Sequence, residues 1–238
     1  MKLDILAFGA HPDDVELGCG GTLAKEIALG KKVGIIDLTR GELGTRGSAD
    51  LRTKEAAAAK DILKAHVREN LDFADGFFTN DKTHQLEVIK ILRKYQPEIV
   101  LCNAIDDRHI DHPKGSKLVS DACFLSGLLK IETELKGVLQ EKWRPKQVHH
   151  YIQWKNIKPD FVVDISGYID VKVAAVNAYG SQFYDPNSKE IETPITSKNF
   201  INSIVYRAQD LGRLIGVDVA EGFTVERYVG VDSLSDLI

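Results

Sequence analysis

Two short segments of the sequence carry side chains that could hold a metal ion. The first, AHPDD at residues 10–14, follows an apolar run and contains one imidazole and two carboxylates. The second, AIDDRHIDH at residues 104–112, follows the apolar run EIVLCN and contains two histidines. Imidazole and carboxylate are the ligands of a catalytic zinc, which typically keeps three protein ligands and leaves a fourth position to water. Together the segments predict a metal site, and they contain more carboxylates than its three ligand positions require.

Each segment taken alone has a simpler interpretation. Aspartate caps helices and proline suits the first helical turn, so His-Pro-Asp-Asp is also typical of a helix start. The two histidines of HIDH could likewise line a polar loop. The metal interpretation is favoured only if both segments lie at the same edge of one sheet, where ligands from separate parts of a chain can meet.

The surrounding sequence predicts such a sheet. Short apolar or β-branched runs alternate with longer helical patterns, and several runs are apolar on both faces. This alternation predicts an α/β, Rossmann-like fold in a single domain of residues 1–238, with a mostly parallel sheet covered by helices on both faces. Strands are expected at residues 3–9, 32–39, 67–73, 98–103, 147–154, 160–166 and 220–231, and helices at residues 21–30, 48–66, 83–95, 167–182 and 199–216.

Composition excludes several classes of protein. The net charge of -4 lacks the basic excess that a phosphate backbone selects, so no nucleic-acid partner is expected. No run of 18 apolar residues and no signal peptide are apparent, which predicts a cytoplasmic protein without a membrane partner. The three cysteines are widely spaced and are expected to be buried, reduced thiols. Residues 184–198, rich in Pro, Asn, Ser and charges, are expected to form a mobile loop.

The two polar segments resemble the signatures of the zinc-dependent de-N-acetylases of the PIG-L/LmbE family. The resemblance continues in GCGGTLAK at 18–25, LTRGELGTRG at 38–47, LRTKEA at 51–56 and YGSQF at 179–183. It is greatest to the bacillithiol-biosynthesis branch, which removes acetyl from N-acetylglucosaminyl malate. The resemblance implies an LmbE-like fold, hydrolysis of a small-molecule glycoside at its acetamide, and a homo-oligomer such as a hexamer.

The resemblance also implies roles for the residues of both segments. His11, Asp14 and His112 would hold Zn²⁺, or Fe²⁺ or another divalent ion in cells. Asp13 would be the general base, since zinc lowers the pKa of water enough for a neighbouring carboxylate to take its proton at neutral pH. After accepting that proton, Asp13 could return it to the departing amine.

Two further residues of the second segment would assist. A protonated His109 beside the metal would stabilise the oxyanion that forms when the acetamide carbonyl is attacked. Asp111 fits a residue that orients an imidazole and raises its basicity. An aspartate that caps the loop is an equally good interpretation of Asp111.

Contacts to the rest of the substrate are expected from the glycine-rich segment, its neighbours and a later helix. Malate presents two carboxylates, which an arginine recognises through paired hydrogen bonds, and Arg52 and Arg108 are the first candidates. Arg46 is a further candidate, although a solvated side chain explains it equally well. Glu42 could accept hydrogen bonds from sugar hydroxyls, and Gln182 could face the cleft or simply pack.

Other functions stay open at this point. The enzyme could deacetylate another N-acetylglucosamine-containing small molecule. A nucleotide-dependent enzyme on the same kind of sheet would leave the His and Asp segments unused, and Gly18, Gly20 and Gly21 lack the G-x-G-x-x-G spacing after the first strand. They are expected to permit close backbone approach instead. A protein that only binds metal or sugar has no use for a second carboxylate such as Asp13.

Overall fold

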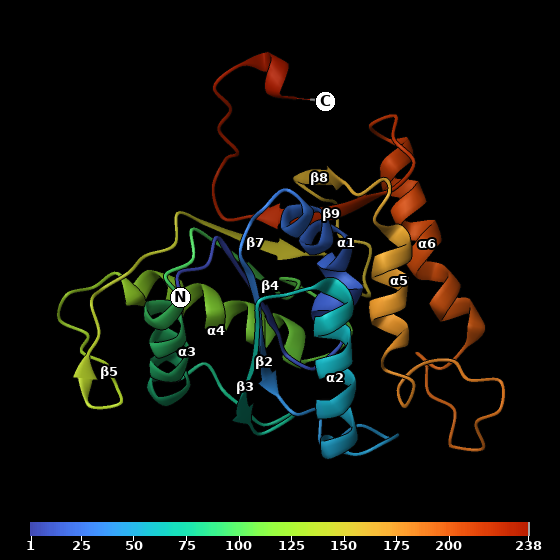
Figure 1. Cartoon of the computed structure of the whole chain (residues 1–238), viewed down its shortest axis with the longest axis horizontal. Helices are drawn as coiled ribbons and strands as arrows, with labels where there is room; N and C mark the ends of the chain where they lie inside the picture. The colour runs from blue at the N-terminus through green and yellow to red at the C-terminus, as the bar shows by residue number, and fades with distance from the viewer. Residues whose placement is uncertain (238) are drawn as a thin grey trace.

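The computed structural model describes residues 1–237 and is built around a seven-stranded sheet (Figure 1). The strand order is β3-β2-β1-β4-β7-β9-β8. Neighbours from β3 to β7 are parallel, whereas β9 is antiparallel to both β7 and β8. The strands are β1 (Ile5–Gly9), β2 (Val33–Thr39), β3 (Val67–Phe73), β4 (Ile99–Cys102), β7 (Gln147–Tyr151), β8 (Phe161–Asp164) and β9 (Ala220–Val225).

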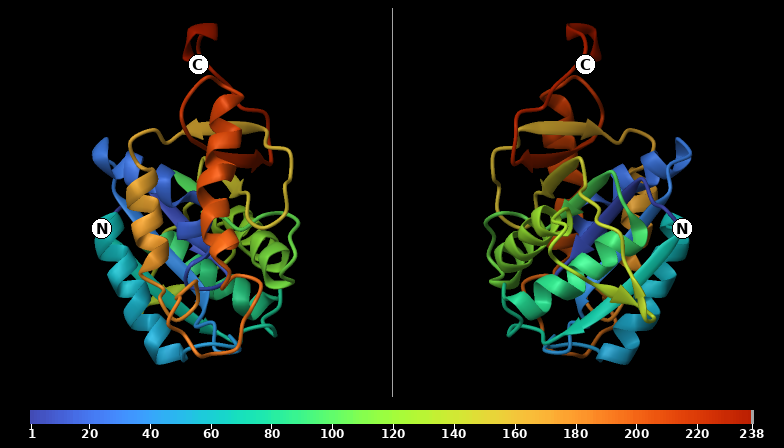
Figure 2. Two further views of the ribbon diagram at one scale, coloured as in Figure 1. Left: turned by 90° about the vertical axis from the view of Figure 1, so that its right-hand side faces the viewer. Right: turned by 90° about the vertical axis from the view of Figure 1, so that its left-hand side faces the viewer.

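Helices cover both faces of this sheet (Figures 1 and 2). On one face lie α3 (Lys82–Tyr95) and α4 (Asp111–Ser126). On the other lie α1 (Asp14–Ala28), α2 (Ala49–Leu63) and α5 (Ile169–Asn177), and α6 (Lys198–Arg213) packs against β9. The α/β fold with a mostly parallel, doubly covered sheet is therefore confirmed.

The central strand shows why the sequence folds this way. In β1, Leu6 and Phe8 pack into the core beneath α3 and α4, while Ile5 and Ala7 pack into the core beneath α1. All four side chains are buried. A strand that is covered on both faces is mostly apolar at successive positions, which is why Ile5–Gly9 lacks the alternation of a half-exposed strand.

Helix α1 begins earlier than the sequence analysis predicted, and its glycines explain how. It starts at Asp14 and is kinked at Cys19, whose φ of -142° is not helical. A Cβ on Gly18 would lie 2.1 Å from Cδ2 of Tyr151, and one on Gly21 would lie 2.6 Å from Cδ1 of Ile165. These glycines therefore allow the helix to lie directly on side chains of the sheet, as expected.

Replacing Gly18 by alanine is expected to destabilise the protein by about 1–3 kcal/mol, because the added methyl overpacks the contact with Tyr151. Gly20→Ala is the matched control in the same helix, since its nearest neighbour would be Cγ of Lys172 at 3.6 Å. That change should be neutral or stabilising. Urea unfolding of both variants measures the difference, and equal losses would show that crowding at position 18 is not the cause.

Several elements differ from the sequence expectations. Helix α4 and the exposed hairpin of β5 (Glu134–Leu135) and β6 (Val138–Leu139) were not predicted, and α5 is shorter than residues 167–182. Residues 184–197 contain neither helix nor strand, as expected for a loop. All three cysteines are buried and free.

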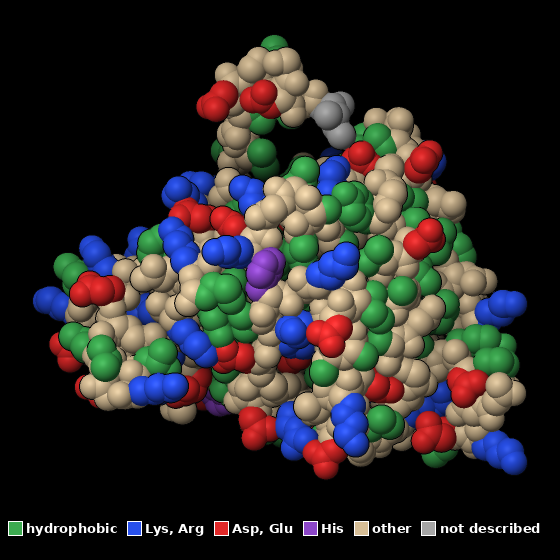
Figure 3. Space-filling view, viewed as in Figure 1, with side chains coloured by type: hydrophobic (Ala, Val, Ile, Leu, Met, Phe, Trp, Pro, Cys, Tyr) green, Lys and Arg blue, Asp and Glu red, His purple; other side chains and the backbone are tan. Residues whose placement is uncertain are grey.

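The surface adds two observations. Within the described residues, no helix combines the length and apolarity needed to cross a membrane. Figure 3 shows acidic and basic side chains interspersed over one face of the molecule, and it shows the segment after β9 rising clear of the body.

Candidate metal and catalytic site

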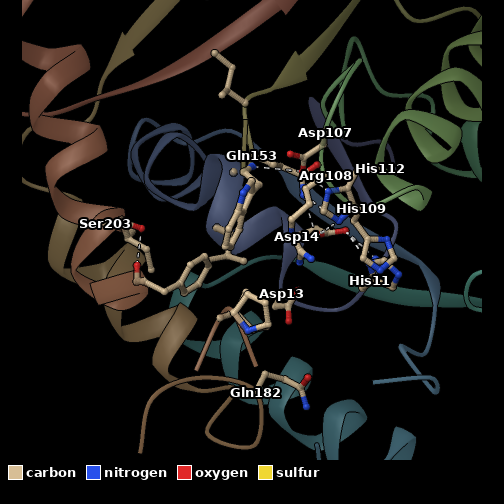
Figure 4. Close-up of a pocket in the computed structure, with 18 of the residues that line it drawn as sticks. His11, Asp13, Asp14, Asp107, Arg108, His109, His112, Gln153, Gln182 and Ser203 are labelled. Atoms are coloured by element: carbon tan, nitrogen blue, oxygen red, sulfur yellow. Dashed lines mark hydrogen bonds and ion pairs between the residues drawn. The ribbon is translucent and has the colours of Figure 1, made fainter. Parts of the chain in front are cut away.

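The carboxyl ends of the five parallel strands deliver polar side chains to one cavity of about 520 Å³. This is the edge at which a parallel sheet binds ligands, because the loops after the strands meet there. Figure 4 shows the labelled side chains from the loop after β1 and those from the loop after β4 pointing toward one another. The cavity-lining residues after each strand are His11, Asp13 and Asp14 (β1), residues 43–46 (β2), Asp75 (β3), residues 107–110 and His112 (β4), and residues 152–154 (β7).

The three predicted metal ligands converge around Asp14. Its Oδ2 lies 3.5 Å from Nδ1 of His11, and its Oδ1 lies 3.1 Å from Nε2 of His112. His11, His109 and His112 also offer one nitrogen each within 4.8 Å of one another. Two imidazoles and a carboxylate at this separation match the donor set of zinc or another divalent transition metal.

Asp14 is held in place as an ionised carboxylate. It accepts hydrogen bonds from the backbone N–H of His11 at 2.9 Å, from Nδ2 of Asn103 at 3.0 Å and from Nε2 of Gln153 at 2.9 Å. Burial alone would raise its pKa, but the charge of His112 and the hydrogen bond to His11 hold the pKa well below its usual range. A fixed negative charge at this point favours a cation.

Further carboxylates hold the outer nitrogens of both histidines. Nε2 of His11 lies 3.0 Å from Asp75 and 3.4 Å from Asp111, which leaves Nδ1 facing Asp14. Nδ1 of His112 is bonded to Asp107, which leaves Nε2 facing Asp14. Ligating histidines usually donate their second N–H to such a carboxylate, which fixes the ring and raises its basicity. Asp111 occupies the position foreseen for it, whereas Asp75 and Asp107 were not predicted.

Removing the charge of Asp107 should therefore weaken metal binding without removing a ligand. Asp107→Asn is expected to lower zinc affinity about 10- to 100-fold, because His112 loses the carboxylate that orients it. Competition with a chromogenic chelator measures the affinity. Asp106→Asn is the control, since its exposed carboxylate pairs with Lys155. Unchanged affinity in Asp107→Asn would show that the ion does not depend on His112.

Asp13 is held differently from Asp14. Its backbone has a φ of 115°, a left-handed conformation that costs a non-glycine residue about 1–3 kcal/mol and is typical of functional sites. Its buried carboxylate accepts a hydrogen bond from Nη2 of Arg52 at 2.8 Å. Burial raises the pKa of Asp13 to about 7, although the charge of Arg52 opposes the shift. A carboxylate with such a pKa can accept and return a proton at neutral pH.

His109 lines the cavity beside both histidine ligands. Its ring lies edge-on to His11, with 4.6 Å between centroids, and is stacked on His112 at 5.1 Å. Burial, together with the charges of His11 and His112, lowers the pKa of His109. Its Nδ1 accepts the backbone N–H of Asp111 at 3.3 Å, which assigns the proton of a neutral ring to Nε2. In this arrangement the ring offers its Nε2–H as a donor to the cavity, and the protonated form expected from the sequence stays a prediction.

Two of the predicted substrate contacts have partners within the protein instead. Arg52 donates to Asp13, to the carbonyl of Pro12 and to the carbonyl of Gly41, so the structure places it behind the proposed base and not against a substrate carboxylate. Arg46 donates to backbone carbonyls of residues 183, 190 and 191 and thereby holds the loop that follows α5. Both guanidinium groups are buried, and the terminal nitrogens of Arg52 are bonded to the protein, whereas its Nε has no hydrogen-bond partner within the described residues.

The other three candidates differ in position. Glu42 is exposed and accepts the backbone N–H of Asp75, and it is not part of the described cavity wall. Gln182 lines the cavity and donates to the carbonyl of Arg46 at 2.9 Å. Arg108 lines the cavity as an exposed side chain, with its guanidinium carbon 4.7 Å from the ring centroid of Trp154.

Comparisons with known proteins agree with this site. The family model described as PIG-L, GlcNAc-PI de-N-acetylase, matches residues 6–123. The chain is 29% identical over 189 residues to the diacetylchitobiose deacetylase of Thermococcus kodakarensis, covering 75% of this chain and 70% of the relative.

Solved structures extend the similarity over the whole fold. The conserved protein TT1542 from Thermus thermophilus is 37% identical, with 97% of this chain and 98% of that chain covered and a TM-score of 0.86. The 4-carboxy-2-hydroxymuconate hydratase GalB from Pseudomonas putida is 22% identical, with 98% and 100% covered and a TM-score of 0.79. A likeness at that level shows the fold alone, so function has to be argued from the side chains. The chain carries both polar segments inside the matched residues, and over these residues it is similar to the PIG-L de-N-acetylases.

Proposed function

We propose that the protein is a zinc-dependent N-deacetylase that converts N-acetylglucosaminyl L-malate to glucosaminyl malate and acetate. The observation that carries this proposal is the pairing of two adjacent aspartates with different environments in one cavity. Asp14 lies between His11 and His112, where it can bind a cation. Asp13 contacts Arg52 instead and stays available for proton transfer.

Each side chain has a definable task in amide hydrolysis. A divalent ion held by His11, Asp14 and His112 would supply Lewis-acid polarisation of the acetamide carbonyl and a water of lowered pKa. Asp13 takes a proton from the attacking water as its oxygen bonds to the carbonyl carbon. His109 donates its Nε2–H to the carbonyl oxygen as negative charge develops there.

The same carboxyl group completes the reaction. Asp13, now protonated, gives its proton to the nitrogen as the C–N bond breaks, which releases a neutral amine and acetic acid, and the acid then loses its proton to solvent as acetate. The hydrogen bond from Arg52 and the backbone conformation of Asp13 keep its carboxylate directed into the cavity throughout. Proton uptake and return by one group therefore need no movement of a second acid.

The proposal is tested by comparing substrates with metal-replete protein. N-acetylglucosaminyl L-malate, N-acetylglucosaminyl inositol, N,N'-diacetylchitobiose and free N-acetylglucosamine are each incubated with the protein, and acetate and primary amine are measured. We expect the malate glycoside to react fastest, and we expect chelation to abolish the reaction and added zinc to restore it. Acetate release from none of the four would contradict a deacetylase. Faster release from diacetylchitobiose would contradict the malate assignment alone.

A further inference from the structure

The cavity extends beyond the metal ligands along one face of α6. Phe200, Ser203, Ile204, Arg207 and Leu211 recur three or four residues apart, and all of them line the cavity. Figure 4 shows Ser203 on α6, across the cavity from Asp14 and His112. This helix face therefore meets the part of a substrate that lies beyond the reacting acetamide.

Most charged side chains of the cavity wall already have partners of opposite charge or polarity. Among the basic side chains, Arg46 is bonded to backbone carbonyls, Arg52 to Asp13, and Lys172 to Glu221 and the carbonyl of Leu17. The acidic side chains are paired as well. Their partners in the structure are Arg52 for Asp13, His112 for Asp14 and for Asp107, His11 for Asp75, and Lys172 for Glu221.

Two arginines of the cavity wall remain without a hydrogen-bonded acceptor among residues 1–237. Arg108 lies over the ring of Trp154, which leaves the N–H edges of its guanidinium group unused. Arg207 is half-buried, and neither a hydrogen bond nor an ion pair engages its guanidinium within this part of the chain. The charged side chains of the cavity wall that lack a hydrogen-bonded or ion-paired partner, Arg108 and Arg207, are therefore both positive.

Arg207 differs from Arg108 because it is half-buried and has no aromatic ring against its guanidinium within the described residues. Burial lowers the pKa of its guanidinium, with the charge of Asp107 opposing the shift. Asp107 is itself engaged, since it bonds to His112 and accepts the backbone N–H groups of Trp154 and Lys155. A half-buried guanidinium that forms no hydrogen bond or ion pair within the described residues can bind an anionic ligand without giving up a bond inside the protein.

We propose that Arg207, together with Arg108, forms a subsite for a carboxylate on the aglycone of the substrate, so that Arg207 determines specificity for anionic glycosides. A planar guanidinium matches a carboxylate through two parallel hydrogen bonds. The inference rests on the proposed function for the identity of the sugar. It assigns this contact to Arg207 on α6, which the sequence analysis did not select, in place of Arg52, whose Nη1 and Nη2 donate within the protein.

The test compares a charged and a neutral product analogue on the metal-loaded protein. Glucosaminyl malate and methyl glucosaminide are titrated calorimetrically into the wild type, Arg207→Gln and Arg213→Gln. Arg207→Gln should weaken binding of glucosaminyl malate about 10- to 100-fold, the usual value of a hydrogen bond to a charged group, and should leave methyl glucosaminide within about twofold. Arg213, an exposed residue of the same helix that pairs with Asp210, is the matched control and should change neither.

Thermal unfolding separates recognition from a structural role. Arg207 forms no hydrogen bond or ion pair within residues 1–237, so Arg207→Gln should leave the Tm unchanged or raised. An equal loss of affinity for both ligands, or no loss for glucosaminyl malate, would overturn the subsite. The two proposals fail in different ways. If the protein deacetylates diacetylchitobiose but binds glucosaminyl malate and methyl glucosaminide equally, the subsite is absent. If it binds glucosaminyl malate through Arg207 but releases no acetate from any substrate, the deacetylase activity is absent.

Discussion

Replacing Asp13 by asparagine is expected to lower the rate of deacetylation about 100- to 10,000-fold while leaving the metal bound. The amide has nearly the same shape and can still accept a hydrogen bond from Arg52, but it cannot take the proton from water. The loss should appear in kcat, because the proton moves only in the transition state. Acetate release measures the rate, and elemental analysis of the same sample measures the metal.

Asp72→Asn is the matched control for this change. Asp72 is also an aspartate with a left-handed backbone, with a φ of 56°, but it is exposed and lies outside the cavity wall. Its variant should keep the full rate. A fully active Asp13→Asn would rule out its role as the base, and a variant that has lost its metal would make Asp13 a ligand.

Truncating His112 to alanine is expected to weaken zinc binding by more than the roughly 10- to 100-fold associated with an outer carboxylate. The change removes a ligand nitrogen that faces Asp14 and leaves that buried carboxylate without its strongest neighbouring positive charge. Zinc content after gel filtration and zinc affinity by competition measure the effect. Activity should fall in parallel, since the proposed chemistry depends on the ion.

His149→Ala is the control for the loss of an imidazole. His149 belongs to β7, packs edge-on against Phe161 and is not part of the cavity wall, so its variant should bind zinc as the wild type does. Full zinc occupancy in His112→Ala would show that the ion is held by the other side chains near His11, such as Asp75 and Asp111.

The fold was largely predictable because its strands are buried on both faces. Mostly apolar runs such as LDILAFG and KVGIIDLT leave few alternatives to a covered parallel sheet. Helix α4 was missed because its first turn consists of the polar residues that were interpreted as a site. The start of α1 was missed for the same reason. In both places one segment is at once a helix start and a ligand loop.

The convergence of the three proposed ligands was predictable, whereas the carboxylates beside them were not. His11, Asp14 and His112 belong to compact motifs, and the structure brings them together. Asp75 follows β3 in a segment, residues 74–81, that contains no histidine or cysteine, and it meets His11 only because β3 ends at the same edge as β1. Asp107 was visible inside the second motif, but its spacing of five residues from His112 carries no distinctive pattern. Contacts that depend on tertiary structure leave little trace in sequence.

Arginines were the least predictable class of residue. A guanidinium group in a glycine-rich motif serves a ligand or the protein equally well, and only the acceptors around it decide between the two. Arg46 and Arg52 proved to be bonded to the protein, while Arg207 lay in an ordinary amphipathic helix and gave no signal. The decisive property is the absence of an internal acceptor, which a sequence does not record.

The hydrogen bond between Arg52 and Gly41 limits how the cavity could be redesigned. Gly41 has a φ of 64°, and a Cβ there would lie 2.0 Å from Nη1 of Arg52, the residue that also holds Asp13. Leu43 and Thr45, two and four residues further on, are exposed and line the cavity. Changes of aglycone specificity are therefore best sought at positions 43 and 45. A side chain at position 41 would instead push Arg52 away and so displace Asp13, without contacting the substrate.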